Sequence, residues 1–179
     1  MARGTIGRML EGLAPVIAAD TRLVILGSFP GAASLAAQQY YGHPRNALWR
    51  LLSALWDEDL VALDYPRRLD ALARHRIGLW DVYRSCEREG SLDSAIRAPV
   101  PNDLAQLRRL APRLQAVAHN GAESARSRRI TEQLGVAVHT LPSTSPANAA
   151  WSFERKLAAW REVFSRYDPM PHPTEAAPR

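Results

Sequence analysis

Short runs of aliphatic residues alternate along the chain with longer stretches in which apolar residues recur every three or four positions. The short runs are typical of strands that are buried on both faces, and they predict strands at residues 23–28, 77–82, 114–119 and 136–141. The longer stretches are typical of amphipathic helices. They predict helices at residues 6–19, with an interruption at Pro15, and at residues 44–56, 66–75, 102–110 and 122–134.

The segment from Phe153 to Tyr167 has the clearest helical pattern in the chain. Its large apolar residues follow one another at steps of four, three, four and three positions: Phe153, Leu157, Trp160, Phe164 and Tyr167. This spacing predicts a helix whose aromatic face packs into the core. Two other segments are expected to lack regular structure, namely the polar loop at residues 85–101 and the proline-rich tail at residues 169–179, which we expect to be disordered.

Strands that are separated by helices favour a parallel sheet with helices on both faces. The chain is therefore expected to be an α/β protein with a four-stranded parallel sheet, forming a single domain over residues 1–168. Three predicted strands end in unusual sequences: GSFPG at residues 27–31, Trp80-Asp81, and LPSTSPAN at residues 141–148. Because ligands bind at the carboxyl ends of the strands in open α/β sheets, these turns are expected to meet in one pocket.

The composition limits which partners and metals the protein is expected to bind. The net charge of +5 favours a partner that carries phosphate groups. The single cysteine, Cys86, permits no internal disulfide, and the five histidines lack metal-ligand spacing, so we expect no metal. No apolar run is long enough to span a membrane and no secretory signal is apparent, so a cytoplasmic protein without a membrane partner is expected.

The glycine-containing turn at residues 27–31 does not match the common nucleotide-binding loops. It lacks the G-x-G-x-x-G pattern of dinucleotide-binding proteins and the Gly-Lys-Ser/Thr sequence of a phosphate-binding loop. Ser28 also lacks the G-x-S-x-G frame of a hydrolase nucleophile. A serine esterase with Ser28 or Ser143 paired to His119 or His139 remains an alternative.

Four segments carry a resemblance to a known family: QYYGHPRNALW at residues 39–49, IGLWDVYRSCEREGSLDSAI at 77–96, AHNGAESAR at 118–126 and LPSTSPANAAW at 141–151. Together with GSFPG they resemble the uracil-DNA glycosylase superfamily, and more narrowly its hypoxanthine (deoxyinosine) DNA glycosylase branch. The resemblance covers residues 23–164. It implies a three-layer α/β/α sandwich and a monomeric enzyme that acts on double-stranded or single-stranded DNA. Such an enzyme hydrolyses the N-glycosidic bond of a deaminated base without metal or cofactor.

Two positions depart from the wider superfamily. Phe29 stands where relatives carry Asp or Asn, and Leu141 stands where many relatives carry His or Asn. In the hypoxanthine branch the catalytic role belongs to an asparagine of the first motif, which matches Asn46. Its carboxamide is able to orient a water molecule, since it both donates and accepts hydrogen bonds. The alternative is that Asn46 only satisfies backbone groups near the start of a helix.

The resemblance also assigns residues to the extruded base. Tyr41 corresponds to the aromatic residue that stacks on the base, whereas Tyr40 is expected to pack in the core. Ser28 and Phe29 are expected to line the same pocket. Asp81 stands where uracil-specific relatives place a base-reading asparagine. A carboxylate there would accept the N1–H of hypoxanthine and repel adenine, although a salt bridge to Arg84 or Arg97 is the alternative.

The remaining assignments concern the DNA backbone. Ser143, Thr144 and Ser145 correspond to the loop that enters the minor groove and holds the nucleotide out, unless they form only a rigid turn. Asn148 is expected to cap the last helix. The basic residues expected at the DNA backbone are His43, Arg45, Arg128 and Arg129, for which a merely solvated face is the alternative.

The function that we expect is therefore a DNA glycosylase for deoxyinosine. Two other functions stay open from the sequence. One is a mismatch-type uracil-DNA glycosylase, and the other is a non-catalytic module that binds damaged or single-stranded DNA in the same pocket.

Overall fold

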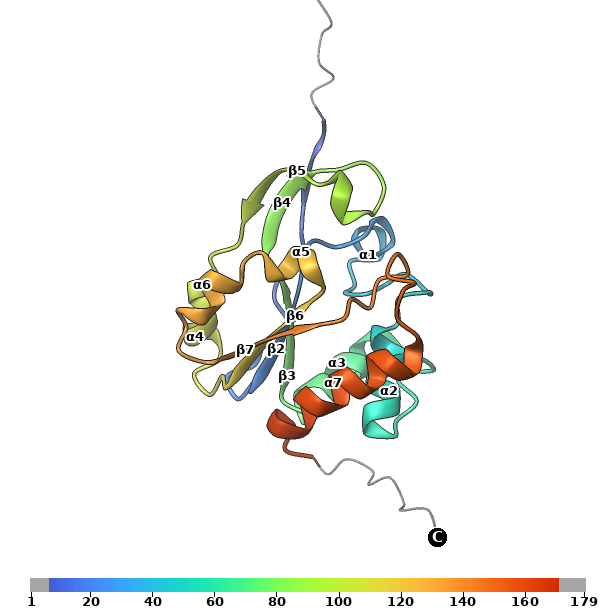
Figure 1. The fold of residues 1–179 in the computed structure, drawn as a ribbon, viewed down its shortest axis with the longest axis vertical. Coiled ribbons are helices and arrows are strands. Elements are labelled where there is room, and N and C mark those ends of the chain that lie inside the picture. Colours follow the sequence, from blue (N-terminus) through green and yellow to red (C-terminus); the bar gives the residue numbers. More distant parts are fainter. Residues whose placement is uncertain (1–6, 171–179) are drawn as a thin grey trace, which may run out of the picture.

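The computed structural model describes residues 7–170, and its centre is a four-stranded parallel sheet (Figure 1). The strands are β2 (Leu23–Gly27), β3 (Ile77–Asp81), β6 (Ala116–Asn120) and β7 (Ala137–Leu141), in the order β3-β2-β6-β7. The register pairs Gly27 with Asp81 and Asn120 with Leu141. The four predicted strands are confirmed, and their last residues lie side by side at one edge of the sheet.

One face of the sheet is covered by α2 (Leu48–Trp56), α3 (Tyr65–Arg74) and α7 (Phe153–Tyr167) (Figure 1). The apolar stripes of these helices pack on alternate strand residues such as Ile25 and Leu79, because successive side chains of a strand point to opposite faces. Trp160 and Phe164 are fully buried there. The prediction that the aromatic face of the last helix packs into the core is confirmed.

The other face is covered by shorter helical segments, which complete three α/β/α layers. They are a 3₁₀ turn (Leu104–Gln106), α4 (Leu107–Leu110), α5 (Ala122–Ala125) and α6 (Arg128–Glu132). A second apolar cluster, which includes Leu107, packs under them. The continuous helices expected at 102–110 and 122–134 are thus broken. His119, on β6, bonds to Ser124 of α5 and to Thr131 of α6, and so anchors each short helix separately.

A second, antiparallel sheet was not expected. It contains β1 (Met9–Glu11), β4 (Tyr83–Glu87) and β5 (Arg97–Pro101), in the order β1-β4-β5. The predictions of a helix at 6–19 and of an irregular loop at 85–101 are wrong. The chain leaves β3 directly into β4, whose backbone groups then pair with both segments. Prolines in β5 are tolerated because it is an edge strand.

The start of one helix and the cap of another also differ from expectation, and one helix is additional. α2 begins at Leu48 rather than at Pro44, because residues 43–46 form a turn in which the Asn46 N–H donates to His43 O. Ser152, not Asn148, caps α7, since its side chain accepts from the Arg155 N–H. The additional helix is α1 (Ala32–Ala37).

Most of the tail that we expect to be disordered, residues 171–179, lies outside the described residues. No helix within residues 7–170 has the length and apolar character needed to cross a membrane.

Candidate active site

A cleft of about 1170 Å³ opens at the carboxyl ends of the parallel strands. All three unusual strand-end turns contribute to its walls, as expected from the sequence. The predicted site residues that line it are Ser28, Phe29, Tyr41, His43, Arg45, Asn46, Asp81, Ser143, Thr144 and Ser145. The fold therefore brings together ten side chains from distant parts of the chain, and it leaves Arg128 and Arg129 outside the cleft.

Asp81 is the most buried charged group of the cleft. Its relative exposure is 5%, and its Oδ2 atom has no hydrogen-bond partner in the described structure. Gly27 makes this position possible, because a Cβ atom at Gly27 would collide with Oδ1 of Asp81. Burial, followed by the charge of Asp93, raises the pKa of Asp81 to about 7, against the opposing effect of Arg88.

The alternative ion pairs of Asp81 are not formed. Arg97 donates instead to the carbonyl oxygens of Ser94 and Ile96. Arg84 lies on β4 with its residue exposed, whereas Asp81 is buried. The carboxyl group is thus left facing the cleft with hydrogen-bonding capacity to spare, which is uncommon for a buried polar group.

Asn120 joins the two main walls of the cleft. Its Nδ2 donates to the Tyr41 hydroxyl at 3.2 Å and to Thr144 Oγ1 at 2.9 Å, and its Oδ1 accepts from the Thr144 N–H at 3.0 Å. Tyr41 has a φ of 54°, a left-handed conformation that is uncommon for a large side chain. Burial, with the charge of Asp81, also raises its pKa. The Asn120 amide therefore fixes both an aromatic wall and the loop opposite.

Sequence analysis missed Asn120. The signal in the sequence was the Asn-Gly pair directly after a predicted strand. The structure explains the glycine, because the loop at residues 142–148 comes close to it. Gly121 has a φ of 96°, and a Cβ there would lie 2.9 Å from Ser143 Cβ.

Asn46 lies at the mouth of the cleft, just before α2. It is half-buried, and its Oδ1 accepts the Leu48 N–H at 3.0 Å. The alternative interpretation, in which Asn46 satisfies a backbone group at the helix start, thus describes one of its contacts. The next residue ties α2 to the opposite loop, since the Ala47 N–H donates to Thr144 O at 2.9 Å. One hydrogen bond thus orients the Asn46 amide, and the backbone beside it is tied to the opposite loop.

Ser28 and Phe29 form the wall next to the antiparallel sheet. The Ser28 hydroxyl donates to Asp93, a residue of the short 3₁₀ turn Asp93–Ala95. Phe29 is 6% exposed, and the guanidinium of Arg88 lies 5.2 Å from the centroid of its ring. Asp93 also lines the cleft, and burial raises its pKa. Sequence analysis missed Asp93 because its segment was expected to be a plain loop.

The loop at residues 142–148 has an internal hydrogen-bond network. Thr144 is fully buried, and Ser143 Oγ accepts the Ser145 N–H at 3.1 Å. Asn148 Nδ2 donates back to Ser143 O. The bonds of Ser143 and Asn148 therefore hold the loop together, and the buried Thr144 side chain ties it to Asn120. Ser143 and Ser145 are half-buried and line the cleft.

The basic residues predicted to contact DNA fall into two groups. His43 and Arg45 are exposed and line the cleft. Arg128 is exposed but engaged on α6, where it bonds to Glu132 Oε1 at 2.7 Å and to Val138 O at 3.1 Å. Only the first group is placed for a ligand of the cleft.

The serine hydrolase arrangement is not present among the described residues. His119 is fully buried and bonds to Ser124 and Thr131; burial, with the charge of Arg128, lowers its pKa to about 4. His139 bonds to the Tyr167 hydroxyl at 2.8 Å. Neither imidazole pairs with Ser28 or Ser143, so the alternative has no catalytic base. No cluster of three or more His, Cys, Asp or Glu residues able to hold a metal ion occurs within residues 7–170.

Comparison with models of known protein families shows which family the chain belongs to. The model of the uracil DNA glycosylase superfamily matches residues 14–164. The chain belongs to this superfamily. The resemblance found in the motifs is thereby confirmed, and with it the fold that the resemblance implied.

Individual proteins are similar to this chain in sequence and in structure. A protein of Methanosarcina barkeri named hypoxanthine DNA glycosylase is 41% identical over 156 residues, which cover 87% of this chain and 98% of the relative. A Methanosarcina acetivorans protein of the same name is 37% identical over 86% of this chain and 97% of its own length. The NMR structure of a Methanosarcina acetivorans protein described as a candidate uracil DNA glycosylase superposes with a TM-score of 0.81. Its sequence identity is 36%, over 89% of this chain and 98% of the other.

Proposed function

We propose that this protein is a DNA glycosylase that releases a deaminated base, principally hypoxanthine, from DNA. The supporting observation is that one cleft joins Asn46, Tyr41 and Asp81 in a chain similar, over most of its length, to proteins named hypoxanthine DNA glycosylase. The three residues have the chemistry that base release requires: a group to orient water, a ring to stack on the base, and a carboxyl group to read the edge of the base.

The proposed role of Asn46 follows from the reaction. Cleavage of the N-glycosidic bond passes through an oxocarbenium-like sugar, while negative charge develops on the departing base. A water molecule must then attack C1′ of the sugar. A carboxamide oxygen accepts two hydrogen bonds, and Asn46 Oδ1 uses one of them for the Leu48 N–H. Its second lone pair accepts a hydrogen bond from the attacking water, and Nδ2 is a donor for the water or the sugar.

Recognition of the base is assigned to Tyr41 and Asp81. Stacking on an aromatic ring contributes about 1–3 kcal/mol and tolerates any base, so Tyr41 supplies affinity. Asp81 supplies selection, because its unpartnered Oδ2 accepts the N1–H of hypoxanthine. Uracil presents a similar N–H beside a carbonyl, which leaves a mismatch-type uracil-DNA glycosylase as the second candidate.

Extrusion of the nucleotide is assigned to the loop at residues 142–148. Enzymes that act on a base take it out of the stack and fill or brace the space left behind. Ser143 and Ser145 lie on a loop stiffened by its own hydrogen bonds, and Arg45 and His43 are exposed beside it. These residues are placed to contact the phosphates and the vacated space.

The test is base release from two otherwise identical duplexes, one with a single deoxyinosine and one with a single deoxyuridine, read out by alkaline strand cleavage. We expect faster cleavage of the inosine strand. Faster release of uracil would favour the second candidate, and binding of damaged DNA without any release would identify a non-catalytic module.

The same assay tests Asn46. We expect Asn46→Ala to lower the rate of hypoxanthine release by about 10²–10³-fold, as for the loss of one fixed hydrogen-bonding group at the reacting centre, with DNA binding nearly unchanged. Asn46→Ser is the matched variant, because its hydroxyl still offers an acceptor to the Leu48 N–H but no carboxamide. Wild-type rates in both variants would remove Asn46 from the mechanism.

A further inference from the structure

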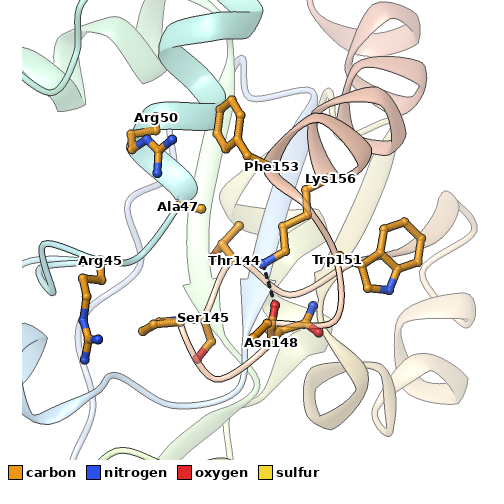
Figure 2. A pocket seen from close by; sticks show the side chains of 11 residues that line it. Arg45, Ala47, Arg50, Thr144, Ser145, Asn148, Trp151, Phe153 and Lys156 are labelled. Carbon is orange, nitrogen blue, oxygen red and sulfur yellow. Dashed lines mark hydrogen bonds between the residues drawn. The ribbon is translucent and has the colours of Figure 1, made fainter.

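A second, smaller pocket lies on the other side of the loop at residues 142–148 (Figure 2). Its volume is about 190 Å³, and it is enclosed by this loop, the start of α2 and the start of α7. Three of the residues that line it are cations, namely Arg45, Arg50 and Lys156, and none of those in the described structure is acidic. We call this site the basic pocket.

Lys156 is the unusual residue of the basic pocket. It is only 6% exposed, and Figure 2 shows its side chain pointing from α7 toward the loop, where Nζ donates to Asn148 O at 3.0 Å. Within residues 7–170 its ammonium group forms no ion pair, and burial lowers its pKa. Nζ has three donors, and removing an ammonium group from water without a counter-charge is costly. An anion in the pocket would remove this cost.

Arg50 adds a second cation in a fixed position. Its guanidinium carbon lies 4.5 Å from the centroid of the Phe153 ring. Stacking on an aromatic face leaves the in-plane N–H donors of a guanidinium available, and their fork matches the oxygens of a phosphate. The pocket thus offers a buried ammonium and a stacked guanidinium.

The basic pocket adjoins the cleft. Arg45, Thr144, Ser145, Asn148 and Trp151 line both spaces, so the loop between them is a shared wall. The backbone of a DNA strand carries a negative charge at every step, so a strand whose nucleotide enters the cleft brings phosphates close to this shared wall. Resting on the function proposed above, we propose that the basic pocket binds one phosphate of the damaged strand, close to the extruded nucleotide, with Lys156 as its main contact.

This contact has a consequence for the loop. Lys156 reaches the phosphate and Asn148 O with the same ammonium group, and Asn148 in turn bonds to Ser143 O. Engagement of the phosphate therefore stiffens the loop that faces the cleft.

The experiment measures affinity for a duplex with a tetrahydrofuran abasic-site analogue, which no glycosylase cleaves. Phosphates around the analogue are replaced one at a time by uncharged methylphosphonates, and binding is followed by fluorescence anisotropy. We expect Lys156→Met to weaken binding about tenfold and to reduce the slope of log affinity against log salt by about 0.9. One methylphosphonate should weaken the wild-type complex by a similar factor and have no further effect on Lys156→Met.

Two other variants complete the design. In Arg50→Met, the methylphosphonate at the same position is expected to have a smaller effect on binding than in the wild type. This variant keeps the test valid if thermal unfolding shows that Lys156→Met is misfolded. Arg109→Met is the matched control, because Arg109 is exposed on α4, which covers the other face of the sheet. Equal losses at every methylphosphonate position in the wild type, Lys156→Met and Arg50→Met would overturn the proposal. If Lys156 and one phosphate depend on each other in binding but the protein releases no hypoxanthine, the proposed function alone would be overturned.

Discussion

At the scale of single residues, the carboxyl group of Asp81 has two hydrogen-bonding forms near neutral pH, since its pKa is raised to about 7. The neutral acid both donates and accepts, so it complements the edge of hypoxanthine and equally that of adenine. The carboxylate only accepts. It suits the N1–H of hypoxanthine and is repelled by the bare N1 of adenine. Selection against adenine is therefore a property of the ionised form.

This argument predicts a pH-dependent preference. Free hypoxanthine and free adenine are compared as inhibitors of base release at a pH of about 6 and a pH of about 8. We expect hypoxanthine to be favoured ~tenfold at the higher pH, as for a hydrogen bond to a charged group, and less at the lower pH. In Asp81→Asn, whose amide complements both bases at any pH, the preference should be small and constant. An unchanged preference in this variant would exclude Asp81 as the selecting group.

Asn120 is predicted to act as a positioning residue. Asn120→Ala leaves the Thr144 N–H without its partner, and an unpaired buried group of this kind costs about 1–3 kcal/mol. We expect a lower midpoint of thermal unfolding and slower base release. The effect on kcat should be larger than the effect on KM, because the loop and Tyr41 lose their common anchor. Tyr41→Phe is the matched variant, since it removes only the bond to the Tyr41 hydroxyl and keeps the stacking ring. A loss confined to stability, with kcat unchanged, would make Asn120 merely structural.

At the scale of elements, the sequence predicts those whose burial is uniform or periodic. Leu23–Gly27 and Ile77–Asp81 are buried at every residue, so their largely apolar sequences located them to within one residue. The helix Phe153–Tyr167 was predicted by its spacing alone. The antiparallel sheet escaped because Met9–Glu11 is a strand only through its pairing with β4. Such pairing is a tertiary effect that overrides local preference.

The site follows the same rule. Asp81 and the loop at 142–148 were expected at one edge of the sheet because strand ends converge in any parallel sheet, and the resemblance assigned their roles. Asp93 was missed because its contact with Ser28 joins residues 65 positions apart, and Asp93 lies in the connection between two strands that the sequence does not reveal. Lys156 was missed because it lies among ordinary charged residues of α7, and only the packed loop buries it.

At the scale of the whole molecule, His75 connects three parts of one helical layer. It follows α3, its Nδ1 bonds to Asp168 at 2.7 Å beyond the end of α7, and its Nε2 bonds to Glu58 at 3.0 Å just after α2. Its ring stacks on Trp56 with centroids 3.8 Å apart. Burial opposes the charged imidazolium, but the hydrogen bonds to Asp168 and Glu58 outweigh it, so the pKa of His75 is raised.

This raised pKa predicts how stability changes with pH. Because the pKa of His75 is higher in the folded than in the unfolded protein, its stabilising effect is complete below the ordinary histidine pKa and is lost as the pH rises through the folded value. We therefore expect the free energy of unfolding of the wild type, relative to His75→Gln, to fall as the pH rises above the ordinary histidine pKa of about 6.5 in urea titrations. His119 is present in both proteins, so its contribution cancels in the difference. Glu58→Gln replaces one of the two carboxylates with a neutral amide and should move the loss to lower pH. A difference independent of pH would mean that His75 is not charged in the folded protein.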